Sequence, residues 1–252
     1  MLLKSVQKTF TILEILCKEG EKGLSELARR LTLGRSNVHR LLATLVDLGY
    51  VEKNPETSRY FPTVRMFEIG AAIMNRTNLH AVVHPFLVKL STEFHETTNL
   101  AILDKGEVVC IDKVESPESL RMDIKIGSRV PAFCTALGKA LLAHLNESEL
   151  IELLQVQKFS CCPKRTITSV ALLNDNLLKV REQGYAIDDE ELLEGVRCIA
   201  TPIRNYSGRV VGALSISGPS VRMSYEKLGQ LKDPLVNTAR EISKKLGNPN
   251  GD

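Results

Sequence analysis

The first third of the chain alternates between apolar helical stripes and short polar turns. A first helix is predicted over 5–20, with Ser5 as its N-cap, because apolar residues follow the spacing of one helix face: Val6, Phe10, Leu13 and Cys17. A second, shorter helix is predicted over 24–31 with Ser25 as a candidate cap, and a three-residue turn with glycine separates it from a third helix over 35–48. Two short helices joined by such a turn form a helix-turn-helix unit.

The third helix carries a polar face opposite its apolar stripe. Donor and cationic side chains repeat on it at helical spacing or flank it: Arg35, Ser36, Asn37, His39, Arg40 and Thr44. Such residues read base edges and phosphates in a major groove, although a polar helix face taken alone is more typical of a solvated surface. A β-hairpin is predicted over 50–61, from which Lys53 and Arg59 could reach flanking phosphates. The order of helices and hairpin favours DNA binding.

The charge is uneven along the chain. The net charge is +3, yet residues 1–78 hold 12 basic and 8 acidic side chains, whereas the remainder holds 21 basic and 22 acidic ones. The excess of positive charge in residues 1–78 is typical of a module that binds a polyanion. The composition, with 43% hydrophobic residues, is that of a folded globular protein, and no run of about 18 apolar residues or signal peptide is present. We therefore expect a cytoplasmic protein that makes no membrane contact.

Beyond the hairpin the pattern changes. Apolar residues predict a linker helix over 64–78, whose wide apolar surface needs a cover from its own domain or from a second copy. The strands that follow are predicted at 98–103, 108–114, 120–126, 185–187, 198–203 and 210–217. The helices are predicted at 82–94, 137–145, 148–154, 171–183 and 225–246. This order indicates an α+β domain in which helices flank an antiparallel sheet.

Several segments resemble the IclR family of bacterial transcriptional regulators. In the N-terminal third the resemblance rests on residues 24–42, which include the run Ser-Asn-Val-His-Arg-Leu-Leu, and on residues 48–51. In the remainder it rests on five further segments: Gly127–Pro131, Thr135–Ala140, Gly184–Glu191, Glu194–Ala200 and Ser215–Pro219. The resemblance covers nearly the whole chain, with its motifs in the family's order.

The resemblance implies an α+β chain with a winged helix-turn-helix domain over 1–63, in which the motif spans 24–45 and the wing 50–61. The linker helix over 64–78 leads to an effector-binding domain over 79–250, an α/β sensor-like (GAF-like) domain with an antiparallel sheet flanked by helices. It further implies a homodimer or dimer of dimers on a pseudopalindromic double-stranded operator. The candidate DNA contacts are Ser25, Arg35, Ser36, Asn37, His39, Arg40, Thr44, Lys53 and Arg59.

The C-terminal motifs indicate a ligand pocket. Residues 135–139 open a helix whose exposed amides suit a carboxylate, and Ser215 and Ser217 alternate with apolar residues, so both point to one face of a strand. By resemblance, the effector is a small organic acid, a sugar acid or an aromatic compound, and bulky Leu137 makes the cleft smaller or more apolar. The implied pocket consists of Met122, Val130, Ala136, Leu137, Asp188, Val196, Cys198, Ser215 and Ser217.

These features favour a transcriptional regulator, most simply a repressor, with an activator of the same architecture as the alternative. An enzyme that uses Asp188, Cys198 and Ser215 is a rival hypothesis, but motifs for nucleophilic, phosphate-binding or zinc-dependent catalysis are missing. A purely structural nucleoid protein fits poorly, because two-thirds of the chain lies outside the basic module. No cysteine-histidine cluster has zinc-ligand spacing, so we expect no metal or cofactor, and the pair Cys161–Cys162 has no assigned role.

Overall fold

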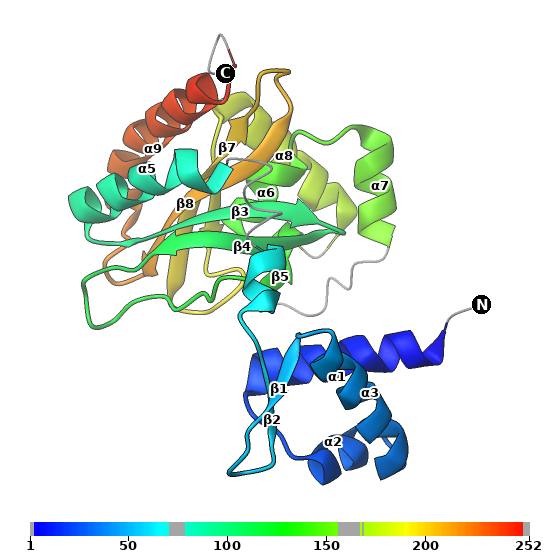
Figure 1. The fold of residues 1–252 in the computed structure, drawn as a ribbon. Helices are drawn as coiled ribbons and strands as arrows, with labels where there is room; N and C mark the ends of the chain where they lie inside the picture. Colours follow the sequence, from blue (N-terminus) through cyan, green and yellow to red (C-terminus); the bar gives the residue numbers. More distant parts are fainter. Residues whose placement is uncertain (1–2, 71–78, 156–166, 168, 249–252) are drawn as a thin grey trace. The chain divides into compact units, whose positions relative to one another are not determined.

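The chain forms two compact units, Met1–Thr77 and Asn78–Asp252, and each is described by itself. The computed structural model describes residues 3–70, 79–155, 167 and 169–248 (Figure 1). Residues 65–70 of the expected linker helix are helical, whereas its remainder over 71–78 lies outside the described residues, as does the pair Cys161–Cys162. No helix within the described ranges combines the length and apolar character that crossing a bilayer requires.

The first unit is a winged helix-turn-helix. Three helices precede a two-stranded antiparallel hairpin: α1 (Lys4–Glu19), α2 (Leu24–Arg30), α3 (Arg35–Asp47), β1 (Val51–Lys53) and β2 (Tyr60–Pro62). The helices and the hairpin share one core, which includes Ile12, Leu16, Leu27, Val38, Leu42, Leu45, Val51 and Tyr60. This arrangement confirms the predicted helix-turn-helix and wing.

The predicted details of α1 and α2 need correction. The buried residues of α1 are Ile12, Leu13 and Leu16, whereas Phe10 is 61% exposed and the predicted stripe would have buried it. The helix α3 and the strand β2 contact α1 on the side of Ile12, Leu13 and Leu16, so of the predicted stripe Leu13 alone is buried and helical spacing did not identify the correct face. The prediction that Ser5 and Ser25 cap the helices is also wrong: Leu3 and Gly23 hold the N-cap positions, and neither helix has a side-chain cap.

The second unit is built on a six-stranded sheet with the order β5-β4-β3-β8-β7-β6, in which all neighbouring strands are antiparallel. The strands are β3 (Thr97–Asp104), β4 (Glu107–Val114), β5 (Arg129–Pro131), β6 (Ala186–Asp189), β7 (Val196–Arg204) and β8 (Val210–Pro219). The sheet separates two buried clusters, as expected when helices cover both of its faces. The predicted α+β architecture is therefore confirmed.

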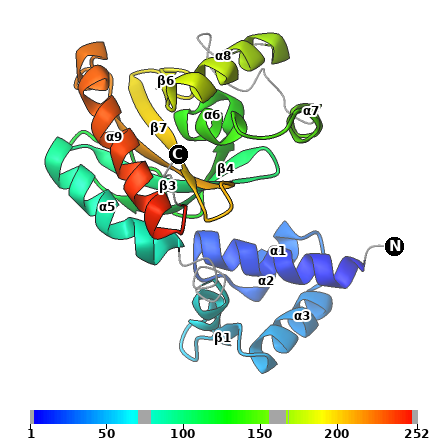
Figure 2. The same ribbon diagram turned by 90° about the horizontal axis from the view of Figure 1, so that it is seen from above.

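Two sets of helices cover the two faces of this sheet (Figure 2). One face packs against α5 (Leu79–Phe94) and α9 (Tyr225–Lys245). The other face packs against α6 (Ala136–Leu142) and α8 (Val170–Gln183), with the short η1 (Ala132–Cys134) before α6 and α7 (Glu147–Gln155) after it. The strand predicted over 120–126 is wrong: this segment has no strand, and the edge strand β5 forms later in the chain.

Gly138 allows α6 to lie directly against η1. A Cβ atom at Gly138 would overlap the backbone of Ala132, including its carbonyl group, and backbone cannot move aside as a flexible side chain can. Every residue of α6 is buried, so the helix has no free direction in which to shift. The close approach of α6 to η1 therefore requires glycine at this position.

We expect Gly138→Ala to lower the free energy of unfolding by about 3 kcal/mol, because the added methyl group forces α6 away from η1. Gly229→Ala is the matched control: Gly229 lies inside α9 with open space around it, and alanine there should stabilise the protein by about 0.5–1 kcal/mol. Urea denaturation of both variants measures the two changes. Equal stability of Gly138→Ala and the wild-type chain would contradict this account.

Candidate functional site

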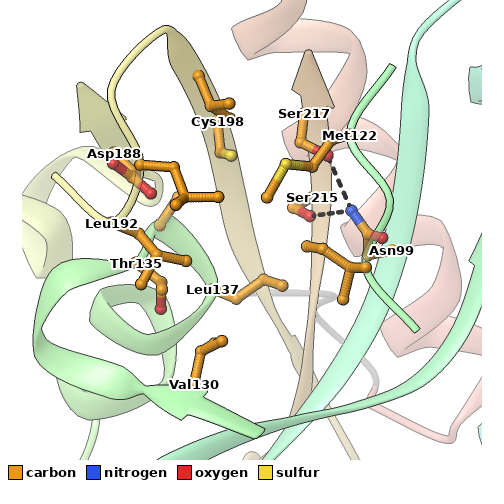
Figure 3. Close-up of a pocket in the computed structure, with 14 residues that line it drawn as sticks. Asn99, Met122, Val130, Thr135, Leu137, Asp188, Leu192, Cys198, Ser215 and Ser217 are labelled. Carbon is orange, nitrogen blue, oxygen red and sulfur yellow. Dashed lines mark hydrogen bonds between the residues drawn. The ribbon is translucent and has the colours of Figure 1, made fainter. Parts of the chain in front are cut away.

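A cavity with a free volume of about 30 Å³ lies between α6 and the sheet in the second unit (Figure 3). The nine residues predicted for the effector pocket all line it: Met122, Val130, Ala136, Leu137, Asp188, Val196, Cys198, Ser215 and Ser217. Five lining residues were not predicted: Asn99, Ile124, Thr135, Leu192 and Leu193. The structure therefore brings together residues from segments spread over more than a hundred positions of the chain.

The sheet side of the cavity carries a buried polar cluster. Ser215 and Ser217 on β8 face α6, whereas the alternate residues of this strand pack against α5 and α9. Asn99 on β3 lies opposite Ser215, and its Nδ2 donates to Ser215 Oγ at 3.2 Å and to Ser217 Oγ at 3.0 Å (Figure 3). The Ser217 hydroxyl donates to the carbonyl of Thr97 at 3.4 Å.

This cluster leaves hydrogen-bonding capacity at the cavity. Asn99 is fully buried, and its Oδ1 atom has no hydrogen-bond partner among the described residues. The Ser215 hydroxyl accepts from Asn99, and its own proton has no acceptor in the part of the chain that the structure describes. A buried acceptor without a partner costs free energy, so a molecule that supplies a donor there gains affinity.

The opposite side of the cavity carries Asp188, which lies next to Cys198 in the pairing of β6 with β7. Asp188 is 2% exposed and accepts the backbone N–H of Glu191 at 2.8 Å. Burial, with a smaller contribution from the nearby Glu191 carboxylate, raises the pKa of the Asp188 carboxyl to about 7. Burial also raises the pKa of the Cys198 thiol well above its ordinary value, an effect that the nearby Asp188 strengthens.

A buried ion pair, which the sequence pattern did not predict, joins α6 to the loop after β6 at the edge of the cavity. Lys139, in the middle of α6, is 1% exposed and pairs with the carboxylate of Glu191, in the loop after β6. The same loop carries Leu192 and Leu193, so the pair ties one cavity wall to α6. A lysine within an otherwise apolar helix was the signal in the sequence, because a buried charge requires a partner.

In the first unit, α3 presents to solvent the polar residues that the sequence predicts to contact DNA. Arg35, Ser36, Asn37, His39, Arg40 and Thr44 are all exposed, as are Ser25 on α2 and Lys53 on β1. Arg59 differs, because its Nη2 donates to Glu26 at 3.0 Å and to the carbonyl of Glu21 at 3.1 Å. Its guanidinium therefore braces the hairpin against α2 in the free protein.

Family models match both the helix-turn-helix unit and the unit that contains the cavity. Residues 5–55 match the model of the IclR helix-turn-helix domain, and residues 71–244 match that of the bacterial transcriptional regulator IclR C-terminal domain. The chain belongs to the IclR family. The HTH-type transcriptional regulator KdgR of Escherichia coli is 40% identical over 245 residues, which cover 97% of this chain and 93% of KdgR.

Two further proteins place this IclR-family chain among regulators of known architecture. The acetate operon repressor of Salmonella typhimurium is 33% identical over 97% of this chain and 90% of its own length. The crystal structure of the Thermotoga maritima IclR is 34% identical, with a TM-score of 0.82 over 96% of this chain and 98% of that one. KdgR and the acetate operon repressor are named as regulators of transcription, and the family to which this chain belongs is one of transcriptional regulators.

The cavity of this IclR-family chain is poorly suited to nucleophilic catalysis. Among the described residues, its lining contains no histidine that could act as a base for Cys198. The raised pKa of the Cys198 thiol keeps it protonated near neutral pH, and the protonated thiol is a weak nucleophile. The buried groups therefore fit recognition of a ligand better than its chemical conversion.

The raised pKa of Asp188 predicts a pH dependence of stability. Between about pH 4 and pH 7, Asp188 keeps its proton in the folded state and loses it in the unfolded state, so stability falls by about 1.4 kcal/mol per pH unit as the pH rises. Above about pH 7 Asp188 is ionised in both states, so the stabilisation that its proton gives at lower pH is gone and stability no longer changes with its titration. Asp188→Asn retains an oxygen that accepts the Glu191 N–H and should remove this slope.

Urea denaturation of the wild-type chain and Asp188→Asn from pH 5 to pH 8 measures the difference between their free energies of unfolding. Asp233→Asn, which removes a carboxylate that is 78% exposed, is the control and should follow the wild-type pH profile. Parallel profiles of the wild-type chain and Asp188→Asn would show that Asp188 does not hold a proton in the folded state.

Proposed function

We propose that this chain is a transcriptional repressor whose affinity for its operator is set by a small organic acid bound in the cavity of the second unit. The observation that carries the proposal is the placement of buried polar groups on both sides of a largely apolar cavity, with Asn99, Ser215 and Ser217 on one side and Asp188 on the other. Small-molecule sites typically place a few polar groups between apolar walls, as this cavity does, and because its free volume is only about 30 Å³, its walls must move apart to admit a ligand. The name of the related acetate operon repressor supports repression, as opposed to activation, of the target genes.

The chemistry of the cavity narrows the class of effector. The Ser215 hydroxyl and the protonated Asp188 carboxyl can each donate a hydrogen bond to a carboxylate. Asn99 Oδ1 requires a donor, which a hydroxyl group of the same ligand supplies. Met122, Leu137 and other apolar residues line the rest of the space, so the ligand is a compact acid with a hydroxyl group and a short apolar part.

DNA recognition is assigned to α3, with the hairpin as wing. Arg35 and Arg40 are exposed on this helix and form no intramolecular ion pair among the described residues, so both guanidinium groups are available. A single winged helix reads few base pairs, and we therefore propose a homodimer, or a dimer of dimers, on a pseudopalindromic site. Exposed apolar side chains of the first unit, Val6, Phe10, Val64 and Phe67, offer surface for such an assembly.

We expect Arg40→Ala to weaken binding by about 1–3 kcal/mol and to relax base preference at one position, if Arg40 reads a base. Arg35→Ala should weaken binding to all sequences alike and lower the salt dependence of the binding constant, if it contacts phosphate. Fluorescence anisotropy with a duplex that the wild-type chain selects from a random library measures both effects.

Arg30→Ala is the charge-matched control, because the Arg30 guanidinium pairs with Glu19 within the first unit. It should retain nearly full affinity for the selected duplex. Full affinity of an Arg35→Ala/Arg40→Ala double variant would exclude α3 as the recognition helix.

We expect Ser215→Ala to raise the Kd of the effector roughly ten- to hundredfold, because the variant lacks one hydrogen bond to a charged group. The ligand is first found by a thermal-shift screen of small carboxylic acids with and without hydroxyl groups, and its Kd is then measured by calorimetry. Ser91→Ala removes another buried serine, on α5 and outside the cavity, and should leave the Kd unchanged. Equal effector affinity of Ser215→Ala and the wild-type chain would contradict the cavity assignment.

A further inference from the structure

A second cluster of potential ligand atoms lies on the other face of the sheet, outside the effector cavity. Asp112 on β4 is 2% exposed, and two histidines of α5 converge on one of its oxygens: His84 Nδ1 lies 2.8 Å from Asp112 Oδ2, and His80 Nε2 lies 3.4 Å from it. The two imidazole rings stack, with centroids 5.4 Å apart. Both histidines are nearly half exposed, so the cluster is open to solvent on one side.

A β-bulge turns Asp112 toward α5. Strict alternation along β4 would place Asp112 on the same face as Val108 and Cys110, toward α6. The pairing register with β3 shifts between Leu100 and Ala101, so that Asp112 lies opposite Leu100, which belongs to the cluster packed against α5 and α9. The extra residue in β4 thus directs a carboxylate to the face on which His80 and His84 lie.

We propose that His80, His84 and Asp112 form a binding site for a divalent transition-metal ion of the zinc class. Two imidazole nitrogens and one carboxylate oxygen are a donor set that zinc takes in proteins, with water at the open position. Their ligand atoms all lie within 4.8 Å of one another, and tetrahedral zinc requires ligand atoms about 3.3 Å apart. The separation of 3.4 Å between His80 Nε2 and Asp112 Oδ2 meets this requirement, and the His84 imidazole, whose Nδ1 lies 2.8 Å from the same oxygen, must move back slightly when the ion displaces the hydrogen bond.

The surroundings of Asp112 hold the carboxylate in place for this role. Its Oδ1 accepts the backbone N–H of Lys113 at 2.8 Å, which leaves Oδ2 directed at the histidines. Outer hydrogen bonds of this kind orient metal ligands. His80 and His84 lie one helical turn apart on α5, so the helix itself sets their spacing. An ion bound here would join α5 to β4.

The test uses the full-length chain without a polyhistidine tag, stripped of metal, and measures Zn²⁺ binding by competition with a chromophoric chelator. We expect one Zn²⁺ ion per chain to be lost, or its Kd to rise by at least about tenfold, in a His80→Ala/His84→Ala double variant and in Asp112→Asn. His39→Ala removes an exposed histidine of the first unit and should bind Zn²⁺ like the wild-type chain.

Two further readouts separate this site from cysteine thiols and from loss of folding. Co²⁺ bound at the site should give ligand-field bands without the sulfur-to-metal charge-transfer band that thiolate ligands produce. Zn²⁺ should raise the melting temperature of the wild-type chain but not that of the double variant, whose substituted side chains are nearly half exposed and leave the core intact. Equal Zn²⁺ binding by the wild-type chain and the double variant, or a Co²⁺ spectrum dominated by sulfur, would overturn the proposal.

Discussion

The cavity that we propose for the effector depends on the buried ion pair of Lys139 with Glu191. Lys139 is 1% exposed within a helix whose seven residues are all buried, and an ammonium group without a partner there would strongly destabilise the fold. The loop after β6 must therefore bring a carboxylate to α6. The same loop places Leu192 and Leu193 on the cavity and the Glu191 N–H on Asp188. One electrostatic requirement thus fixes two walls and the surroundings of the Asp188 carboxyl.

The polar groups of the cavity explain how a domain with a close-packed core can respond to a small molecule. The sheet buries Asn99 and Ser215 at the space where α6 and the loop after β6 meet, and folding leaves part of their hydrogen-bonding capacity unused. A ligand that satisfies these groups binds one arrangement of the domain in preference to others. Such differential affinity is what allows a bound ligand to change the affinity of the protein for DNA.

The sequence predicted those features that follow from local periodicity. Alternation along one strand correctly placed Ser215 and Ser217 on a common face, because the period of two is a property of the extended backbone. The apolar residues of 120–126 wrongly predicted a strand, since β4 pairs instead with the later segment Arg129–Pro131. Asn99 escaped prediction because its role depends on the register of β3 with β8, and Asp112 because a bulge reverses its face. Register and bulges arise from long-range pairing, which local patterns do not encode.

Occupation of the cavity should change the affinity of the chain for DNA, and by thermodynamic linkage DNA must then change the affinity for the effector by the same factor. The Kd of the selected duplex is measured with and without saturating effector, and the Kd of the effector with and without saturating duplex. The account predicts that the effector weakens DNA binding and that both ratios equal the same factor, roughly 5–150. An effector that binds in the cavity while both ratios remain at one would contradict the account.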